Sequence, residues 1–350
     1  MNKLHIVLIF ICLCSMHSIG CKKPDTITTK IAFGSCGHED HPLSIFDVVV
    51  DHDPDLFIFL GDNIYGDTDD MSILQSKYNQ LTSKSTYKNL KHNVPIIATW
   101  DDHDFGQNDA GRHYPYKSES KEIFLNVFDE PSDSDRRNRE GIYTSSYYRH
   151  GSRTLQIILL DTRTFRDDIL MYDGAFDEDK RYFYNLEYMP HITTDSTFLG
   201  QDQWEWLEKE LSEPADIRII GSSTQFGIEF NGYEAWANFP HEQKRFLELI
   251  KRKRASGVIF ISGDVHYAEI SKFHEEELYP IYDITSSGLS SKWHFATPNK
   301  NRIEGPIMHN HFGLITIEWN DENPKLTFEI FDVNDNQRIE YNINLSDIQF

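Results

Sequence analysis

Positive charge is scarce in this sequence of 350 residues. Lys and Arg together number 34 against 56 Asp and Glu, so the formal net charge is −22. A protein that binds nucleic acid needs a basic stripe to replace the counterions of the phosphate backbone. DNA and RNA are therefore disfavoured as partners, and no nucleic-acid-binding surface is expected.

The sequence also lacks a Pro-, Ser- or Gly-rich linker, a low-complexity segment and an internal repeat. Its 39% hydrophobic, 26% charged and 13% aromatic residues are typical of a folded globular protein. One large domain is favoured over two, and its expected extent is 30–350.

The apolar run near the N-terminus, Leu4 to Leu13, is too short to anchor a protein across a bilayer. It follows the basic Lys3, and small residues precede Cys21, a pattern that predicts a lipoprotein signal peptide over 1–20 and a short tether over 21–29. The predicted protein is exported and held at the bacterial cell envelope, on the periplasmic side or the cell surface, by lipid on Cys21 alone. Ser18 stands where such signals usually have Leu, so ordinary secretion is the alternative.

Cysteine is scarce as well, with four residues. Cys12 and Cys14 lie in the predicted signal peptide and Cys21 would carry lipid, so Cys36 is the only free thiol and an internal disulfide is excluded. A lone thiol in an oxidising compartment is vulnerable unless it is buried or bound to a metal. Burial as a small hydrophobic residue is the ordinary alternative to metal binding.

Short apolar runs rich in β-branched and aromatic residues predict buried strands, and helical periodicity separates several of them. This alternation indicates an α/β fold with helices that cover the sheets. Near the end, 312–319 and 325–331 are expected to form an antiparallel hairpin, followed by a strand-like 341–350. The other predicted strands are 30–34, 56–60, 94–99, 155–160, 217–220, 258–261 and 279–284, and the predicted helices are 42–53, 201–211 and 241–254.

Polar clusters follow five of these strands. A single Asp after a strand is usually a turn or a helix cap, but five clusters favour a functional site, because the carboxyl ends of strands converge at one edge of an α/β sheet. The clusters are Gly34-Ser35-Cys36, Gly61-Asp62-Asn63-Ile64-Tyr65, Trp100-Asp101-Asp102-His103-Asp104, Asp161-Thr162-Arg163 and Gly263-Asp264-Val265-His266.

Two adjacent metal ions need a carboxylate that bridges them, and Asp62 is the candidate. On one side the thiol of Cys36, the phenol of Tyr65 and the imidazole of His266 form an electron-rich set that suits iron before zinc. Tyr65 is equally able to pack its ring and donate its hydroxyl to a backbone acceptor.

Oxygen ligands dominate the other side of the predicted pair. Asp102 and Asp264, helped by Asn108 or Asp101, suit Ca²⁺, Mn²⁺ or Mg²⁺. Ten Asp or Glu and no Lys or Arg lie between positions 39 and 70, and most of these acids are expected to be solvated surface that raises the local cation concentration.

Two further residues are candidates for catalysis. His103 lies between Asp102 and Asp104, which would favour its imidazolium and suit a phosphate contact or a proton donor, although it could be an ordinary loop histidine. Arg163 is placed to bind a phosphate ester in bidentate fashion, with a surface ion pair as the alternative.

In these clusters and in Leu199-Gly200-Gln201-Asp202-Gln203-Trp204, the sequence over about 30–291 resembles the PhoD-like alkaline phosphatases, a branch of the calcineurin-like metallophosphoesterases. The resemblance implies a four-layer α/β/β/α sandwich of two mostly mixed sheets with flanking helices. It also implies a phosphoesterase site in which His103 touches the phosphate. The implied ligands are Cys36, Asp62, Tyr65 and His266 for ferric iron, and Asp62, Asp102 and Asp264 for calcium.

The sequence departs from the family pattern in two respects. Larger bacterial members carry an added N-terminal β domain and a C-terminal helix over the active site, whereas here the core begins within ten residues of Cys21, so a more open site is expected. Other metallophosphoesterases also have a metal-binding His between the third and last motifs. Here 222–225 occupies that region, with Gln225 as the nearest candidate.

The favoured function is a metal-dependent phosphoric ester hydrolase, a phosphomonoesterase or phosphodiesterase in which a metal-bound hydroxide attacks a small phosphate ester. One alternative is a non-enzymatic, calcium-binding envelope lipoprotein. Another is a phospholipase-type phosphodiesterase in which Trp236 and Phe239 would touch an acyl chain.

Overall fold

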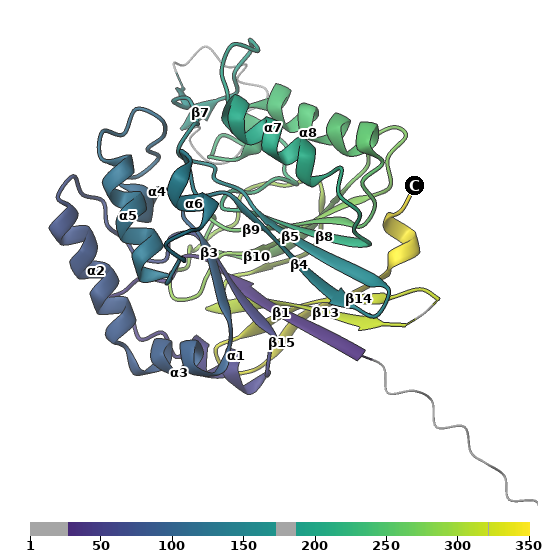
Figure 1. Ribbon diagram of the computed structural model, residues 1–350, viewed down its shortest axis with the longest axis horizontal. Coiled ribbons are helices and arrows are strands. Elements are labelled where there is room, and N and C mark those ends of the chain that lie inside the picture. Colours follow the sequence, from purple (N-terminus) through teal and green to yellow (C-terminus); the bar gives the residue numbers. More distant parts are fainter. Residues whose placement is uncertain (1–26, 173–186, 321) are drawn as a thin grey trace, which may run out of the picture.

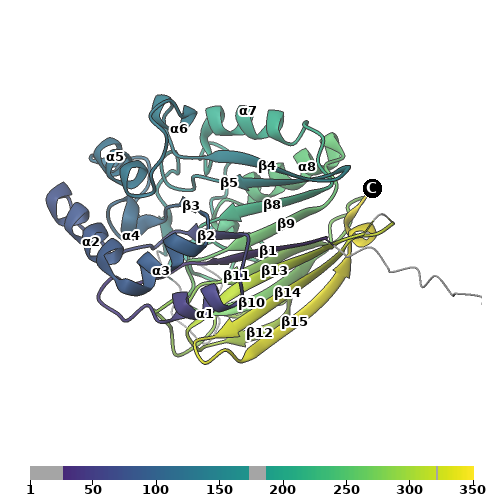
Figure 2. The same cartoon turned by 60° about the horizontal axis from the view of Figure 1, so that its bottom comes forward.

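In the computed structural model, which describes residues 27–172, 187–320 and 322–350, two β-sheets stack face to face and helices cover their outer faces (Figures 1 and 2). The expected α/β/β/α sandwich of two mixed sheets is confirmed. The predicted signal peptide, Cys21 and most of the predicted tether lie outside the described residues. Within those residues, no helix combines the length and apolar character that a bilayer crossing requires.

The first sheet has parallel and antiparallel parts. β1 pairs in parallel with β2, and β2 with β3, while the pairings on the other side of β1 are antiparallel. The strands in order across this sheet are β15 (Gln337–Asn344), β14 (Lys325–Asp332), β13 (His311–Trp319), β1 (Ile27–Gly34), β2 (Leu56–Leu60) and β3 (Ile96–Thr99).

The second sheet is also mixed. Its central pairings, β11 with β9, β9 with β8 and β8 with β5, are parallel, and the outer ones are antiparallel. The order across this sheet is β12 (Arg302–Ile307), β10 (Ala268–Phe273), β11 (Ile281–Ser286), β9 (Val258–Ser262), β8 (Ile217–Ser222), β5 (Arg153–Leu159) and β4 (Thr144–His150).

Helices from the N-terminal half pack on the first sheet, and α7 and α8 pack on the second, on the opposite side of the molecule (Figure 1). A short pair, β6 (Leu170–Met171) and β7 (Tyr188–Met189), lies outside both sheets. The helices are α1 (Ile45–Asp51), α2 (Met71–Ser83), α3 (Ser85–Asn93), α4 (Asp102–Phe105), α5 (Lys117–Val127), α6 (Asp135–Asn138), α7 (Gly200–Glu210) and α8 (Pro240–Lys253), with 3₁₀ turns at Trp236–Asn238 and Leu345–Ile348.

The continuous apolar sequence of β2 follows from its position between two cores. Leu56, Ile58 and Leu60 belong to the core between the sheets, whereas Phe57 and Phe59 belong to the core under the helices. Successive side chains of a strand point to opposite faces, so a strand covered on both sides is apolar throughout. This burial fixes the end of β2, and with it the position of the residues that follow.

The structure differs from the expected elements mainly at edges. β1 begins at Ile27 and not at residue 30, because Ile27 to Thr29 pair with β13, so these residues belong to the sheet and not to the tether. The last strand ends at Asn344, and the residues after it form a 3₁₀ turn. Among the longer elements, the strands β4, β10 and β12, none of which has a continuous apolar run, and the helices α2, α3 and α5 were not expected.

Candidate functional site

The carboxyl ends of β1, β2, β3 and β9 meet at one edge of the sandwich. Cys36 follows β1, Asp62 follows β2, Asp102 begins α4 after β3, and Asp264 and His266 follow β9. Backbone hydrogen bonds join the first two loops, from Cys36 N to Gly61 O at 3.3 Å and from Gly37 N to Asp62 O at 2.9 Å. The two sheets are joined at the same edge, where the hydroxyl of Thr99 donates to Leu160 O at 2.7 Å.

Four of the predicted ligands have an unusual backbone. Cys36, Asp62, Asp264 and His266 have φ angles of 58°, 49°, 74° and 58°, in the left-handed region that L-residues with a side chain seldom adopt. Each such residue costs roughly 1 kcal/mol or more, and residues of this kind cluster at functional sites. Gly61, with a φ of 103°, has no Cβ and so lets the loops after β2 and β3 approach, since a Cβ there would lie 2.6 Å from Asp101 N. The loops are therefore shaped to bring side chains together.

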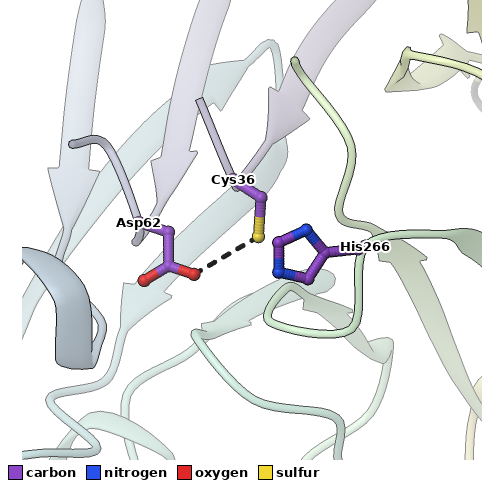
Figure 3. Close-up of side chains that lie close together, drawn as sticks. All are labelled: Cys36, Asp62 and His266. Atoms are coloured by element: carbon purple, nitrogen blue, oxygen red, sulfur yellow. Dashed lines mark hydrogen bonds between the residues drawn. The ribbon is translucent and has the colours of Figure 1, made fainter. Parts of the chain in front are cut away.

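The first group contains Cys36, Asp62 and His266, whose ligand atoms all lie within 4.8 Å of one another. Figure 3 shows the three side chains converging from separate loops. The thiol of Cys36 is 3.4 Å from Asp62 Oδ2, and the side chain of Cys36 is fully buried. A thiol, a carboxylate and an imidazole at this separation are a donor set for iron or zinc.

The second group contains the carboxylates of Asp62, Asp101, Asp102 and Asp264, again within 4.8 Å of one another. Asp62 belongs to both groups and also to a third one with Asp102 and His103. It therefore has the position expected of a bridging ligand. A cluster of carboxylate oxygens is the donor set that Ca²⁺, Mg²⁺ and Mn²⁺ prefer.

Several buried polar atoms in these groups and in Tyr65 have no hydrogen-bond partner in the described part of the chain. Buried polar atoms in folded proteins are nearly always bonded, so several unbonded ones in one part of the molecule need an explanation. Bound metal ions would supply partners for buried donors of this kind. The atoms are Asp62 Oδ1, Tyr65 Oη, Asp101 Oδ2, Asp102 Oδ1 and His266 Nδ1.

The protein alone disfavours the charged form of three of these four acids. Burial, followed by the charge of Asp102, raises the pKa of Asp62 well above its usual range. Burial and the charge of Asp101 do the same to the pKa of Asp264, and burial raises the pKa of Asp101 to about 7 although Arg163 opposes it. For Asp102, burial would raise the pKa, but the charges of Arg163 and His103 lower it. Bound cations would lower the pKa values of Asp62, Asp101 and Asp264 again, because positive charge favours the carboxylate form.

His266 and Cys36 show the same dependence on a metal. Burial, with the charge of His103, lowers the pKa of His266 to about 4, so its imidazole is neutral and able to bind a metal. Burial and then the charge of Asp62 raise the pKa of the Cys36 thiol well above its usual value. The thiolate form therefore requires a cation at the site.

Tyr65 lies between two imidazoles. Its ring centroid is 4.7 Å from that of His38 and 4.4 Å from that of His103, and its buried hydroxyl has no hydrogen-bond partner in the described segments. Burial, followed by the charge of Cys36, raises the pKa of Tyr65 well above its usual value. If Tyr65 only packed its ring, its hydroxyl would need a backbone acceptor, and the described residues provide none. Binding to a metal ion would give the hydroxyl oxygen a partner.

His103 is held by an acid that the sequence did not suggest. Its Nδ1 is 2.8 Å from Asp67 Oδ1, whereas the neighbouring Asp104 turns away to accept hydrogen bonds from Asn63, Tyr78 and Asp101 N. Burial alone would lower the pKa of His103, but the charge of Asp62 and the hydrogen bond with Asp67 raise it to about 10. Asp67 therefore orients the ring and favours its charged form.

Arg163 is fully buried, so its contacts are with the protein and not with solvent. Its guanidinium pairs with Asp101 through Nε and Nη2, and Nη1 lies 2.8 Å from Glu234 Oε1. This burial excludes the surface ion pair, and a contact between Arg163 and a phosphate ester stays a prediction. Arg163 holds Asp101 in place and offsets the charge of the acidic cluster.

Four other positions considered in the sequence lie apart from the two groups. Asn108 is exposed and donates to Asp109 Oδ2 at 2.8 Å, so its role as a ligand stays a prediction. Gln225 donates to Glu269 and Thr285 within the second sheet. Trp236 and Phe239 are both 0% exposed in the core, so the expectation that they touch an acyl chain is wrong.

Sequence reasoning missed three acids near the site. Asp67 holds His103, and Glu234 reaches Arg163 from a distant loop. Glu39, which was grouped with solvated surface, is fully buried and accepts from Tyr65 N at 2.9 Å and from Lys77 at 2.5 Å. The position of Asp67, two residues after Tyr65, was a signal that could have been used, whereas neither Glu39 nor Glu234 has a local pattern that points to the site.

Comparison with known proteins assigns the chain to a family. The family model of the PhoD-like phosphatase matches residues 74–303, which is most of the chain. The protein therefore belongs to the PhoD-like phosphatase family.

Two individual relatives can be compared in detail. Alkaline phosphatase D of Bacillus subtilis (strain 168) is 25% identical over 232 residues, which cover 57% of this chain and 36% of that protein. The chain thus matches about a third of the length of this curated relative. The solved structure of PhoD superposes with a TM-score of 0.70 at 16% identity, over 90% of this chain and 71% of that one.

A more distant structure shares the same fold. A dimetal phosphatase from Danio rerio superposes with a TM-score of 0.52 at 12% identity and covers 91% of this chain and 98% of its own. At this level of identity, the likeness to both solved structures concerns the fold alone.

Proposed function

We propose that this protein is a metal-dependent phosphoric ester hydrolase that acts on small phosphate monoesters, diesters or both. The observation that carries the proposal is the position of Asp62, which is shared by a group containing a thiol and an imidazole and by a group of four carboxylates. Membership of the PhoD-like phosphatase family supports it.

The residues divide between two metal ions. Cys36, Tyr65 and His266 with Asp62 would hold iron, and zinc is the alternative. Asp102 and Asp264 with Asp62, aided by Asp101 or Asn108, would hold calcium, with manganese or magnesium as alternatives. When bound, the metal ions supply positive charge that activates water and neutralises the phosphoryl oxygens.

His103 is suited to bind the phosphoryl group. The Nδ1 of His103 is hydrogen-bonded to Asp67, and the Nε2 of His103 has no hydrogen-bond partner among the residues described. The imidazolium can therefore donate from Nε2 to a phosphoryl oxygen. Asp67 fixes the ring orientation, which spares the reorganisation that a mobile side chain would need. Arg163 contributes indirectly, because its ion pair with Asp101 holds that carboxylate in position.

The direct test is hydrolysis of an aryl phosphate monoester and an aryl phosphate diester by purified protein, before and after metal removal and readdition. We expect turnover that chelation abolishes and that iron with calcium restores. Asp102→Ala is expected to remove turnover while the protein stays folded. Protein that binds calcium and hydrolyses neither ester would instead favour the non-enzymatic alternative.

The iron assignment has a separate test. Ferric iron bound to a phenolate and a thiolate absorbs visible light, because both are electron-rich anions. The pure protein should be coloured, dithionite should bleach it, and Tyr65→Phe should shift or remove the band. A colourless, fully active protein with zinc or manganese would reject iron and leave the hydrolase proposal standing.

Localisation is a further part of the proposal. A lipid on Cys21 would hold the protein at the cell envelope, because lipid chains and not a hydrophobic span would then bind the membrane. Cys21→Ser should move the protein from the membrane fraction to the soluble fraction. Retention of this variant on membranes would reject lipidation.

A further inference from the structure

Ser287 lies between two of the predicted ligands of the first metal. It follows β11 directly and its side chain is fully buried. Its Oγ is 3.1 Å from Cys36 Sγ and 2.8 Å from the backbone N of His266. One hydroxyl therefore touches two ligands that come from different sheets.

The direction of these hydrogen bonds follows from the protons available. The backbone N–H of His266 can only donate, so Ser287 Oγ accepts from it. A serine hydroxyl has a single proton, and the contact with Cys36 Sγ is where that proton can be donated. The thiol proton of Cys36 has acceptors of its own, Asp62 Oδ2 at 3.4 Å and the carbonyl of Asp264 at 3.6 Å. A thiolate has no proton to donate, so in that form of Cys36 the hydroxyl of Ser287 is the donor.

The backbone holds this hydroxyl in place. Ser35 and Ser287 form a parallel bridge that joins the first sheet to the second. Ser35 N donates to Ser286 O at 3.1 Å, Leu289 N donates to Ser35 O at 3.0 Å, and Ser287 N donates to Tyr267 O at 3.3 Å. The segment is anchored on both sides, so Ser287 meets the sulfur at a fixed position.

We propose that Ser287 is a positioning residue that donates a hydrogen bond to the Cys36 thiolate in the metal-loaded protein and ties it to the loop of His266. A hydrogen bond to a metal-bound sulfur draws electron density away from the metal, and partners of this kind orient ligands and tune metal sites. The inference rests on the proposed function, because it requires Cys36 to be a metal ligand.

The test uses Co²⁺ as a probe, because the thiolate-to-cobalt absorption band reports on the sulfur without any need for turnover. Chelator-stripped protein is loaded with Co²⁺ as wild type, Ser287→Ala and Ser287→Thr, the last of which keeps the hydroxyl. Ser286→Ala is the matched control, since Ser286 is the adjacent buried serine and its hydroxyl has no hydrogen-bond partner in the described structure.

We expect the band of Ser287→Ala to move to longer wavelength, because a thiolate without its donor is more electron-rich. Its Co²⁺ affinity should fall about tenfold or more, the usual effect of losing a hydrogen-bond partner of a metal ligand. Ser287→Thr and Ser286→Ala should match the wild type. If Ser287→Ala does not fold, Ser287→Val against Ser287→Thr makes the same comparison, since the two differ by a methyl in place of the hydroxyl.

The two possible failures are distinct. A thiolate band in the wild type that Ser287→Ala leaves unmoved, with unchanged Co²⁺ affinity, would overturn the role of Ser287 alone. Cobalt-loaded wild type with no thiolate band would show that Cys36 is not a ligand, and the proposed metal site would fail with it.

Discussion

Two sets of buried acids lie in the same sandwich and have opposite surroundings. In the open set, at the ends of β2 and β3, Asp62 Oδ1, Asp101 Oδ2 and Asp102 Oδ1 are buried without hydrogen-bond partners in the described chain. In the closed set, Asp161 is equally buried and follows β5 in the same way, but both of its oxygens are fully bonded.

Asp161 illustrates the closed set. Its Oδ1 accepts from Trp100 Nε1 at 3.0 Å, Arg163 N at 3.0 Å and Thr164 N at 2.9 Å. Its Oδ2 accepts from Ile142 N at 2.8 Å and from the hydroxyl of Thr164 at 2.6 Å. A carboxylate with five donors needs no cation, so its function is to organise the loop that carries Arg163.

Glu269 and Asp283, in β10 and β11, belong to the same closed set. Asp283 accepts from Phe226 N, Gly227 N and the Ser262 hydroxyl at 2.7–2.8 Å. Glu269 accepts from Gln225, Asn299 and Arg302. The difference between the sets teaches that a buried acid indicates a metal site only where protein donors fail to satisfy it.

The largest expected effect comes from Asp62→Asn, which changes the shared ligand of the open set and keeps its shape. Turnover of an aryl phosphate should fall by roughly a thousandfold or more, since removal of a single charge-stabilising group costs about 10²–10³ and this carboxylate serves both metals. Rate measurements at saturating substrate and metal provide the check.

The same variant should not be less stable without metal, because it removes one of several mutually repelling acids. Thermal unfolding of the chelated proteins measures this. A strongly destabilised Asp62→Asn would place Asp62 in the closed set and contradict its assignment.

Asp161→Asn should show the reverse pattern. The amide nitrogen cannot accept, so at least one buried donor loses its partner, and each such loss costs about 1–3 kcal/mol. We expect a free energy of unfolding lower by roughly 3 kcal/mol, with metal content per folded molecule unchanged. Denaturant titration and metal analysis of the two proteins give both quantities, and loss of metal at full stability would reverse the comparison.

The smallest expected effect is a pH dependence of the metal-free protein. The pKa values of Asp62, Asp101 and Asp264 are raised in the folded state, so these three acids hold more protons there than in the unfolded chain between about pH 4 and pH 7, and they outnumber His266, whose lowered pKa acts in the opposite direction. The free energy of unfolding should therefore fall as pH rises through this range. Bound metal should remove the slope, because it replaces the protons. Thermal melts at several pH values, with Asp62→Asn as the flatter control, would test it.

Much of the fold was predictable from the sequence. Strands that are buried on both faces, such as β2 and β9, consist of an unbroken apolar run that can be recognised in the sequence. β4 was not predictable, since it pairs at the edge of the sheet and its Thr144 to His150 sequence is half exposed. The acids, the thiol and the imidazole of the strand-end clusters lie close together, as expected. Partners such as Glu234 and Ser287 were not foreseen, because their positions follow from packing of distant segments and leave no local pattern.

The central claim, that the open set of acids exists to bind metal, is tested most directly by element-resolved metal analysis. Wild type, Asp62→Asn and Asp161→Asn would be purified without chelators and measured per folded molecule. We predict at least two metal ions in wild type and Asp161→Asn, iron among them, and loss of most of this metal from Asp62→Asn. Wild type that hydrolyses phosphate esters with no more metal than Asp62→Asn would contradict the claim.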